Sequence, residues 1–261
     1  MNHQKSFLNL LQIFAKTVTG SQNSFLVFFE ELKLLKNKTY IFKLKNGLKF
    51  RVRGKTSDLK EVVIVNLIDE YPTKFLLEIP QNTQVLDLGA HIGSFSIMLA
   101  KLRPDLSIYS IEPSLANNTL LKQNISTNFS NPNIACYKYI ISSVDGPMTL
   151  NTEGEPDSWH VDKNVVDKKN EIVASKKLST LLSEEKISNL SFIKMDVEGA
   201  EYEILSGSKD LIKSLHSIIL EYHDADGIQP HSFFKDYFQS INFDILLEND
   251  HIVYAKNQSV K

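Results

Sequence analysis

The 261-residue sequence predicts a doubly wound α/β fold with a mostly parallel, seven-stranded sheet. From Gln84 onward, short apolar runs alternate with helical segments, which is the pattern of a parallel sheet. The first of these runs leads through two glycines into an amphipathic helix, as in nucleotide-binding βαβ units. The last two runs are separated only by Asn249 and Asp250, so we expect them to form an antiparallel hairpin.

The order of apolar runs and start and stop residues gives the predicted elements. The predicted strands are 84–89, 106–111, 134–141, 191–196, 217–222, 243–248 and 251–255, with later helices at 200–213 and 231–241. Before the sheet come helical patterns at 5–17, 23–36 and 58–70, and alternating runs over 40–53 that flank Asn46-Gly47, a strong hairpin signal. We therefore divide the chain into an N-terminal extension of helices and a β-hairpin cap, 1–80, and a sheet-bearing domain, 81–261.

Composition and charge exclude several classes of function. The net charge of -2 gives no overall field that attracts nucleic acid, so no nucleic-acid partner is expected. The single cysteine, Cys136, forms no internal disulfide and has no metal-binding companion, which fits a cytoplasmic protein. We expect no signal peptide and no transmembrane segment, because the apolar runs are too short. Contact of residues 1–36 with a membrane surface or a partner remains open, as does the oligomeric state.

The segment VLDLGAHIGSFS predicts a cofactor site. Gly89 permits a sharp turn, the following helix start favours a carboxylate, and Asp87 is placed to meet an ammonium group directly or through water. Glu112, at the end of the next strand, is placed to accept hydrogen bonds from both ribose hydroxyls. Each feature alone is equally typical of an ordinary turn or a solvated strand end. Together they indicate a nucleoside cofactor, and the acid before the glycines favours S-adenosylmethionine (SAM) over NAD, whose G-x-G-x-x-G spacing is absent. The predicted cofactor-binding residues are Asp87, Gly89, Ala90, His91, Gly93, Glu112, Pro113 and Ser142.

A second group of polar residues follows two later strands. Lys194, Asp196 and Glu198 alternate along extended chain and so point the same way, and IILEYHD ends in Glu221 and His223. Strand ends of this kind open onto the ligand crevice, so the predicted catalytic residues are Asp196, His223, Glu198 and Glu221. His223 has the ordinary pKa of a general base. Glu198 is equally interpretable as a helix cap, His223 as a plain loop residue, and Lys194 as a structural ion-pair partner.

These carboxylates and the histidine are also the residue types that hold Mg²⁺ or Mn²⁺. Because they lack a diagnostic ligand spacing, we predict no metal.

The motifs VLDLGAHIGSFS, IEPS, NISTN, FIKMDVEGAEYEIL and IILEYHD, in this order, resemble the FkbM family of methyltransferases over residues 84–224. The resemblance implies a Rossmann-like methyltransferase domain at 81–261. It also implies SAM-dependent O-methylation, usually of a hydroxyl on a sugar, glycan or other small-molecule natural product. Two positions depart from the family pattern: His91 stands where Asn is frequent, and Ser179 where an acid is common. Ser179 indicates a different acceptor contact.

Two other functions remain as alternatives at this level. One is a non-catalytic SAM-binding or scaffold protein, and the other is an NAD-dependent enzyme. The stretch 144–190 is long for a connection and is a possible lid. It contains Trp159 beside Asp157 and His160, and Trp159 either stacks on a sugar face or packs a small hairpin.

Overall fold

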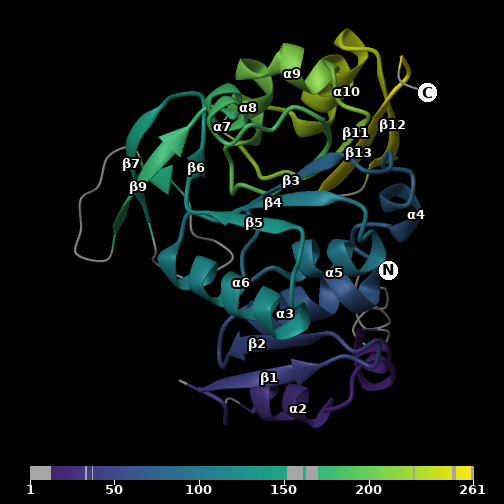
Figure 1. Ribbon diagram of the computed structural model, residues 1–261, viewed down its shortest axis with the longest axis vertical. Coiled ribbons are helices and arrows are strands. Elements are labelled where there is room, and N and C mark those ends of the chain that lie inside the picture. The colour runs from purple at the N-terminus through teal and green to yellow at the C-terminus, as the bar shows by residue number, and fades with distance from the viewer. Residues whose placement is uncertain are drawn as a thin grey trace.

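The computed structural model describes residues 13–32, 34–36, 38–151, 161–162, 170–225, 227–248 and 251–259. Its central sheet has seven strands in the order β12-β13-β11-β10-β3-β4-β5 (Figure 1). β13 pairs antiparallel with both β11 and β12, and all other pairs of the sheet are parallel, so the mostly parallel sheet and its final hairpin are confirmed. The strands are β3 (Gln84–Leu88), β4 (Ser107–Ile111), β5 (Ile134–Tyr137), β10 (Leu190–Met195), β11 (Ser217–Glu221), β12 (Phe243–Glu248) and β13 (Ile252–Asn257).

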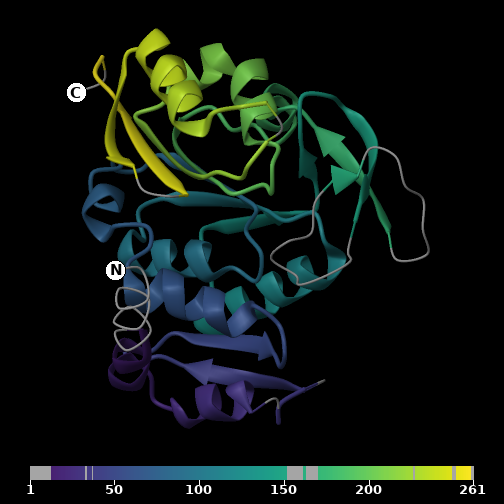
Figure 2. The ribbon, with the colours of Figure 1, turned by 180° about the vertical axis from the view of Figure 1, so that it is seen from behind.

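Helices cover both faces of this sheet, as the ribbon shows from two sides (Figures 1 and 2). One layer holds α5 (Ser94–Leu102) and α6 (Leu115–Asn128), and the other holds α8 (Glu201–Gly207), α9 (Lys209–Lys213) and α10 (Pro230–Ser240). Alternate residues of a strand point to opposite faces. Leu86 and Leu88 accordingly pack with Tyr202 and Phe234 on the α8–α10 side, while Val85 packs with Phe95 on the α5 side.

The N-terminal hairpin, β1 (Thr39–Lys43) and β2 (Lys49–Arg53), packs against the α5–α6 layer. Phe42 and Phe50 are fully buried in a cluster that also contains Ile92 and Leu121. The side chain of Asn124 on α6 bonds the backbone N–H and C=O of Arg51, at 2.7 and 3.2 Å. The hairpin and the first two helices after the glycine turn therefore share one apolar core.

The remaining N-terminal elements are α2 (Phe25–Glu31), α3 (Asp58–Val63) and α4 (Thr73–Leu76). The helix predicted over 23–36 is shorter than expected, and that over 58–70 changes to a π-helical segment at Ile64–Ile68 before Asp69 ends it with a left-handed φ of 64°. Part of the helix predicted over 5–17 lies outside the described residues, whereas 13–20 are helical. Within the described part of the chain, no helix has the length and apolar character that crossing a bilayer requires.

The predicted strand 134–141 is wrong as a single element. It divides into β5 and β6 (Ile140–Ile141), because β6 leaves the central sheet and pairs with β9 (Glu171–Lys176). With β7 (Gly146–Leu150) and β8 (Val161–Asp162) they form a second sheet, order β6-β9-β7-β8, after which α7 (Leu178–Glu184) returns to the core. The stretch 144–190 thus supplies β7, β8 and β9 of the second sheet, while Asp157, Trp159 and His160 lie outside the described residues.

The helix predicted over 200–213 is also divided, into α8 and α9, by Ser208, whose φ of -127° is not helical. The helix predicted over 231–241 corresponds to α10 within one residue at each end.

Candidate functional site

The turn after β3 needs glycine for two reasons. Gly89 and Gly93 have left-handed φ values of 76° and 92°, which side chains other than glycine rarely adopt. A Cβ on Gly89 would also lie 1.6 Å from the backbone carbonyl oxygen of Asp196, so the end of β3 and the residue after β10 touch through their backbones. His91 has a φ of 48°, a conformation that His and Asn tolerate better than most residues. This explains why His91 can occupy a position where Asn is frequent.

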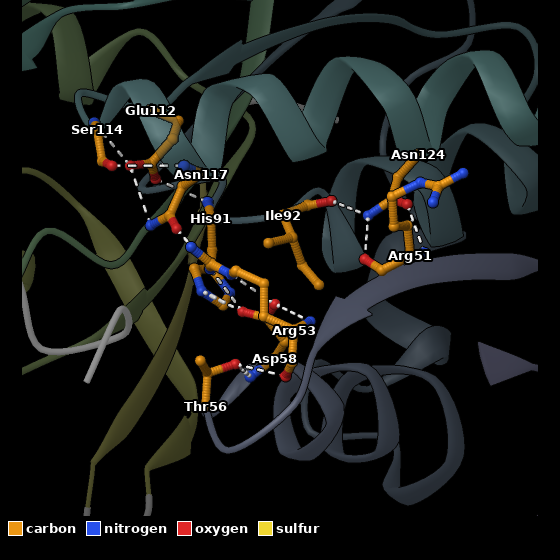
Figure 3. A network of polar contacts seen from close by, with 10 residues as sticks. All are labelled: Arg51, Arg53, Thr56, Asp58, His91, Ile92, Glu112, Ser114, Asn117 and Asn124. Atoms are coloured by element: carbon orange, nitrogen blue, oxygen red, sulfur yellow. Dashed lines mark hydrogen bonds and ion pairs between the residues drawn. The ribbon is translucent and has the colours of Figure 1, made fainter. Parts of the chain in front are cut away.

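Glu112 lies at the end of β4 with its carboxylate almost completely buried (Figure 3). One oxygen accepts from the backbone N–H of His91 at 2.9 Å, and the other from the N–H of Ser114 at 2.9 Å and the amide of Asn117 at 3.4 Å. Burial raises the pKa of Glu112 to about 7 in spite of these donors. A carboxylate has about four acceptor positions, so these three bonds leave room for a ligand hydroxyl.

An ion pair from the N-terminal segment, Arg53 with Asp58, contacts two of the residues around Glu112 (Figure 3). Arg53 donates to the carboxylate of Asp58 at 2.8 and 2.7 Å and to the Asn117 side-chain oxygen at 2.7 Å. Asp58 is fully buried, and its Oδ1 lies 3.4 Å from Nε2 of His91. Hairpin, turn and Glu112 are therefore joined by one polar network. Sequence reasoning missed Arg53, Asp58 and Asn117, because no local pattern marks residues that meet only through tertiary packing.

Lys194 is buried at the centre of the strand ends. Its Nζ donates to the carbonyl of Gly89 at 2.9 Å and to Oδ2 of Asp196 at 3.2 Å, and lies 3.6 Å from Oδ1 of Asp87. Burial alone would lower the Lys194 pKa, but the carboxylates of Asp196 and Asp87 outweigh it and raise the pKa above its usual value. The geometry matches the interpretation of Lys194 as a structural ion-pair partner.

Asp87 lies near the carboxyl end of β3 and is buried. It has no exposed surface, and its carboxylate accepts from Ser96 Oγ at 2.5 Å and faces Lys194. Burial raises its pKa. Its contacts are thus inside the protein, and contact between Asp87 and a cofactor ammonium group stays a prediction.

Three further residues of the predicted cofactor set have different surroundings. Ala90 is buried in the turn, where its N–H bonds the carbonyl of Ile111 at 3.0 Å, and Pro113 directly follows Glu112. Ser142 follows β6, and its hydroxyl bonds Ser175 of β9 at 2.8 Å and the carbonyl of Val144, in the connection to β7, at 3.1 Å. The contacts of Ser142 therefore connect it to the second sheet, and its role at the cofactor stays a prediction.

Three of the four predicted catalytic residues come together after β10 and β11. One side-chain ligand atom each from Asp196, Glu198 and His223 lies within 4.8 Å of the other two. Nε2 of His223 is 3.3 Å from Glu198, and its Nδ1 is 3.1 Å from Glu201. Glu201 is fully buried and also accepts from the backbone N–H groups of Val197 and Gly199. The imidazole is therefore fixed in orientation by a carboxylate that sequence reasoning missed, although it stands within the quoted motif.

The electrostatics of this cluster favour bound protons. Burial raises the pKa of Glu198 to about 8, and burial followed by repulsion from Asp196 raises that of Glu221. For His223, burial lowers the pKa, but the hydrogen bond to Glu201 and the charge of Glu198 outweigh it and raise the pKa to about 9. Glu70, from the segment before α4, interacts electrostatically with the same cluster: burial, and then the charge of Glu221, raise its pKa to about 8. Glu70 was not predicted from the sequence.

These shifts predict that stability decreases as the pH rises. The folded state holds protons on Glu198 and His223 above their ordinary pKa values of 4.5 and 6.5, so it binds more protons than the unfolded chain. The His223 contribution is complete below pH 6.5 and is lost as the pH passes about 9. We expect urea denaturation to give a lower free energy of unfolding at pH 9 than at pH 6, with a flatter dependence in Glu198→Gln. A free energy that is level over this range would contradict the assignment.

The Asp196, Glu198 and His223 atoms also have the spacing and donor types that a Mg²⁺ or Mn²⁺ ion accepts. A carboxylate on the second ring nitrogen, here Glu201, is the usual support of a metal-bound histidine. The same contact orients a histidine that accepts a proton, so the geometry fits both uses. That the site functions without metal stays a prediction.

Comparison with known proteins gives consistent matches. The model of the methyltransferase FkbM domain matches residues 87–245. Methyltransferase sdnD of Sordaria araneosa is 25% identical over 186 residues, covering 59% of this chain and 72% of its own. The 2-O-methyltransferase NoeI of Sinorhizobium fredii is 24% identical, covering 58% and 67%. Among solved structures, magnesium protoporphyrin IX methyltransferase from Synechocystis PCC 6803 aligns over 76% of this chain and 83% of its own, at 14% identity and a TM-score of 0.44.

Proposed function

The chain belongs to the FkbM methyltransferase family, and from this we propose that it transfers a methyl group from SAM to a hydroxyl of a sugar, glycan or other small molecule. The observation that carries the proposal is the backbone contact of Gly89 with Asp196, which sets the cofactor turn beside the polar cluster after β10. Similarity to a relative named 2-O-methyltransferase supports a hydroxyl acceptor. Membership in an enzyme family leaves no basis for the NAD-dependent or scaffold alternatives.

The residues of the turn fit SAM. Ser94, the first residue of α5, has a buried hydroxyl that has no hydrogen-bond partner among the described residues. Together with the start of α5 it offers polar groups to the amino-acid part of the cofactor. Glu112 retains acceptor capacity for a ribose hydroxyl. When bound, SAM supplies a methyl group activated on a sulfonium.

The protein must orient the acceptor hydroxyl and remove its proton. An alcohol is a weak nucleophile near neutral pH, so a positioned base increases the rate. We assign this role to Nε2 of His223, because Glu201 holds the opposite ring nitrogen and Nε2 itself lies in the polar cluster, 3.3 Å from Glu198. Asp196, 3.2 Å from Lys194, is assigned to orient the acceptor.

The proposed function is tested by following labelled methyl groups from SAM into sugar, glycan and lipid extracts, with calorimetry of SAM, S-adenosylhomocysteine and NAD alongside. We expect both adenosyl ligands to bind, NAD not to bind, and label to enter a base-stable ether. Label in a carboxyl ester or an amine would contradict the hydroxyl assignment. Repeating the assay with EDTA and then with added Mg²⁺ decides whether the cluster uses a metal.

Replacing Glu112 by Ala should weaken SAM binding by about 1.5–3 kcal/mol, because the charged acceptor for the ribose is lost. The matched control is Glu78→Ala, which removes an exposed glutamate paired with Lys256 far from the turn. Calorimetry should show reduced affinity only for the Glu112 variant. To separate binding from folding, the same variants are compared with a 2′,3′-dideoxyribose analogue, for which the loss should shrink. Equal affinities in a folded Glu112→Ala protein would remove the ribose assignment.

We also propose a cytoplasmic location. Cys136 is a free, half-buried thiol, and burial raises its pKa to about 11, so it is protonated and unreactive near neutral pH. An unpaired thiol of this kind fits a reducing compartment.

A further inference from the structure

Positive and negative charges are distributed unequally along this chain. Residues 1–55 contain 11 of the 29 Lys and Arg residues but only two of the 31 Asp and Glu residues. This segment therefore carries a formal charge of +9, and residues 56–261 carry -11. The near-neutral total conceals a cationic segment, and such a segment is attracted to anionic surfaces.

The same segment exposes a cluster of aromatic rings on α2. Phe25 and Phe28 are 59% and 60% exposed, and Phe29 is 38% exposed. The ring centroid of Phe29 lies 6.1 Å from that of Phe25 and 6.2 Å from that of Phe28, so the three form one continuous patch. Leu26 and Val27 pack against the core instead. The helix is thus apolar on both its inner and its outer side, and the outer side is uncovered, which is unusual for an exposed surface helix.

Glu30, an acid of α2, has its side chain directed toward the hairpin. Its carboxylate accepts from the hydroxyl of Tyr40 at 3.0 Å and from the backbone N–H of Lys55. The pKa of the Tyr40 hydroxyl is raised by burial and then by the charge of Glu30. The negative charge of Glu30 is therefore held on the side of α2 that faces the hairpin.

Lysines flank α2 at both ends. At its start, the N–H of Gln22 bonds the carbonyl of Lys43 at 2.8 Å, and Lys45 bonds Gly20 at 2.8 Å. At its end, Lys55 bonds Glu30. Six lysines of the hairpin region are exposed: Lys36, Lys38, Lys43, Lys45, Lys49 and Lys55.

The position of α2 leaves this surface accessible. The helix lies at one end of the long axis of the molecule, beyond the hairpin and opposite α8, α9 and α10 (Figures 1 and 2). Docking through α2 would leave the strand ends of the central sheet free.

We propose that α2 and the hairpin lysines dock the enzyme onto an anionic lipid surface. The rings of Phe25, Phe28 and Phe29 enter the boundary between headgroups and acyl chains, and the lysines contact the anionic headgroups. The combination favours lipid over a nucleic acid, because phosphates alone give no reason for three neighbouring phenylalanines to stay uncovered. The proposal concerns where the enzyme works and does not depend on the identity of its acceptor.

Co-sedimentation of the full chain with vesicles tests the proposal. We expect binding to phosphatidylcholine vesicles that contain phosphatidylglycerol, little binding to phosphatidylcholine alone, and partial loss at high salt. Replacing Phe25 and Phe28 by Ser should lower the partition coefficient by about tenfold or more, since burial of aromatic surface is lost. The matched control replaces Ile172 and Leu246, which are 75% and 47% exposed elsewhere, by Ser and should leave binding unchanged.

Three results would overturn the proposal. They are failure of the wild-type chain to bind anionic vesicles, equal vesicle binding by wild type and the Phe25/Phe28 double variant, and binding to RNA that is as strong as to vesicles and insensitive to this variant. Circular dichroism and thermal melting accompany each variant. Because the replaced side chains are exposed in both double variants, both are expected to melt like the wild type.

Discussion

Replacing His223 by Ala is expected to lower the rate of methyl transfer by about 10²–10⁴-fold while SAM affinity is retained, because a positioned base contributes on this scale. Nε2 of His223 faces Glu198, and Nδ1 contacts Glu201. The imidazole ring is therefore oriented before an acceptor binds. Single-turnover incorporation of label measures the rate, and calorimetry measures the affinity. The matched control is His231→Ala, an exposed histidine that also contacts a glutamate, Glu248.

The pH dependence gives a second readout for the same residue. Since only neutral His223 accepts a proton, and its pKa is raised to about 9, the wild-type rate should increase with pH up to that value. Glu201 is a positioning residue, and Glu201→Gln should move the inflection to lower pH by removing the charge that favours the imidazolium. Near wild-type turnover in His223→Ala would transfer the role of base to Glu198, Glu221 or the substrate.

Replacing Lys194 by Met is expected to reduce the free energy of unfolding by about 3–5 kcal/mol, because it leaves a buried carboxylate without its cation. Asp87 is fully buried, and Lys194 is its ion-pair partner. The ammonium group also bonds the Gly89 carbonyl at 2.9 Å, so the turn loses a support. Urea denaturation at pH 7 measures the change.

The control for this variant is Lys256→Met. Lys256 pairs with Glu78, but both side chains are partly exposed, at 28% and 45%. Solvent screens such a pair, and its removal should cost about 0–1 kcal/mol. If Lys194→Met is no more destabilising than Lys256→Met, the buried carboxylates must be neutral in the folded state, and Lys194 does not hold them.

Much of the fold could be predicted because its signals are local. Apolar runs and glycines indicated the strands of the central sheet, and the two residues between the predicted strands 243–248 and 251–255 indicated the final hairpin. The prediction failed where tertiary contacts determine which strands pair. The run 134–141 looks continuous, but β6 pairs with β9, which lies 30 residues further along the chain. Nothing within the run itself indicates that partner.

The candidate site shows the same limit. Asp196, Glu198 and His223 come together because the adjacent parallel strands β10 and β11 end at one edge of the sheet. The expected extended chain over 194–198 is wrong, because β10 ends at Met195 and Glu198 has a left-handed φ of 53°. Glu201 stands only three residues after Glu198, yet its role depends on the α8 start turning it toward His223. The roles of Arg53 and Asp58 could not be predicted from the sequence, because these residues contact Asn117 and His91 only once the hairpin packs against the α5–α6 layer.

The shared core of hairpin and helices has a consequence for cooperativity. Phe42 and Phe50 of the hairpin are buried together with Ile92 and Leu121, and Arg53 bonds Asn117, so a cut at residue 80 would sever an apolar core. A core that spans such a boundary couples the unfolding of both sides into one transition. The glycine turn is consequently held by chain on both sides of it, by the hairpin that precedes it and by Lys194 that follows it.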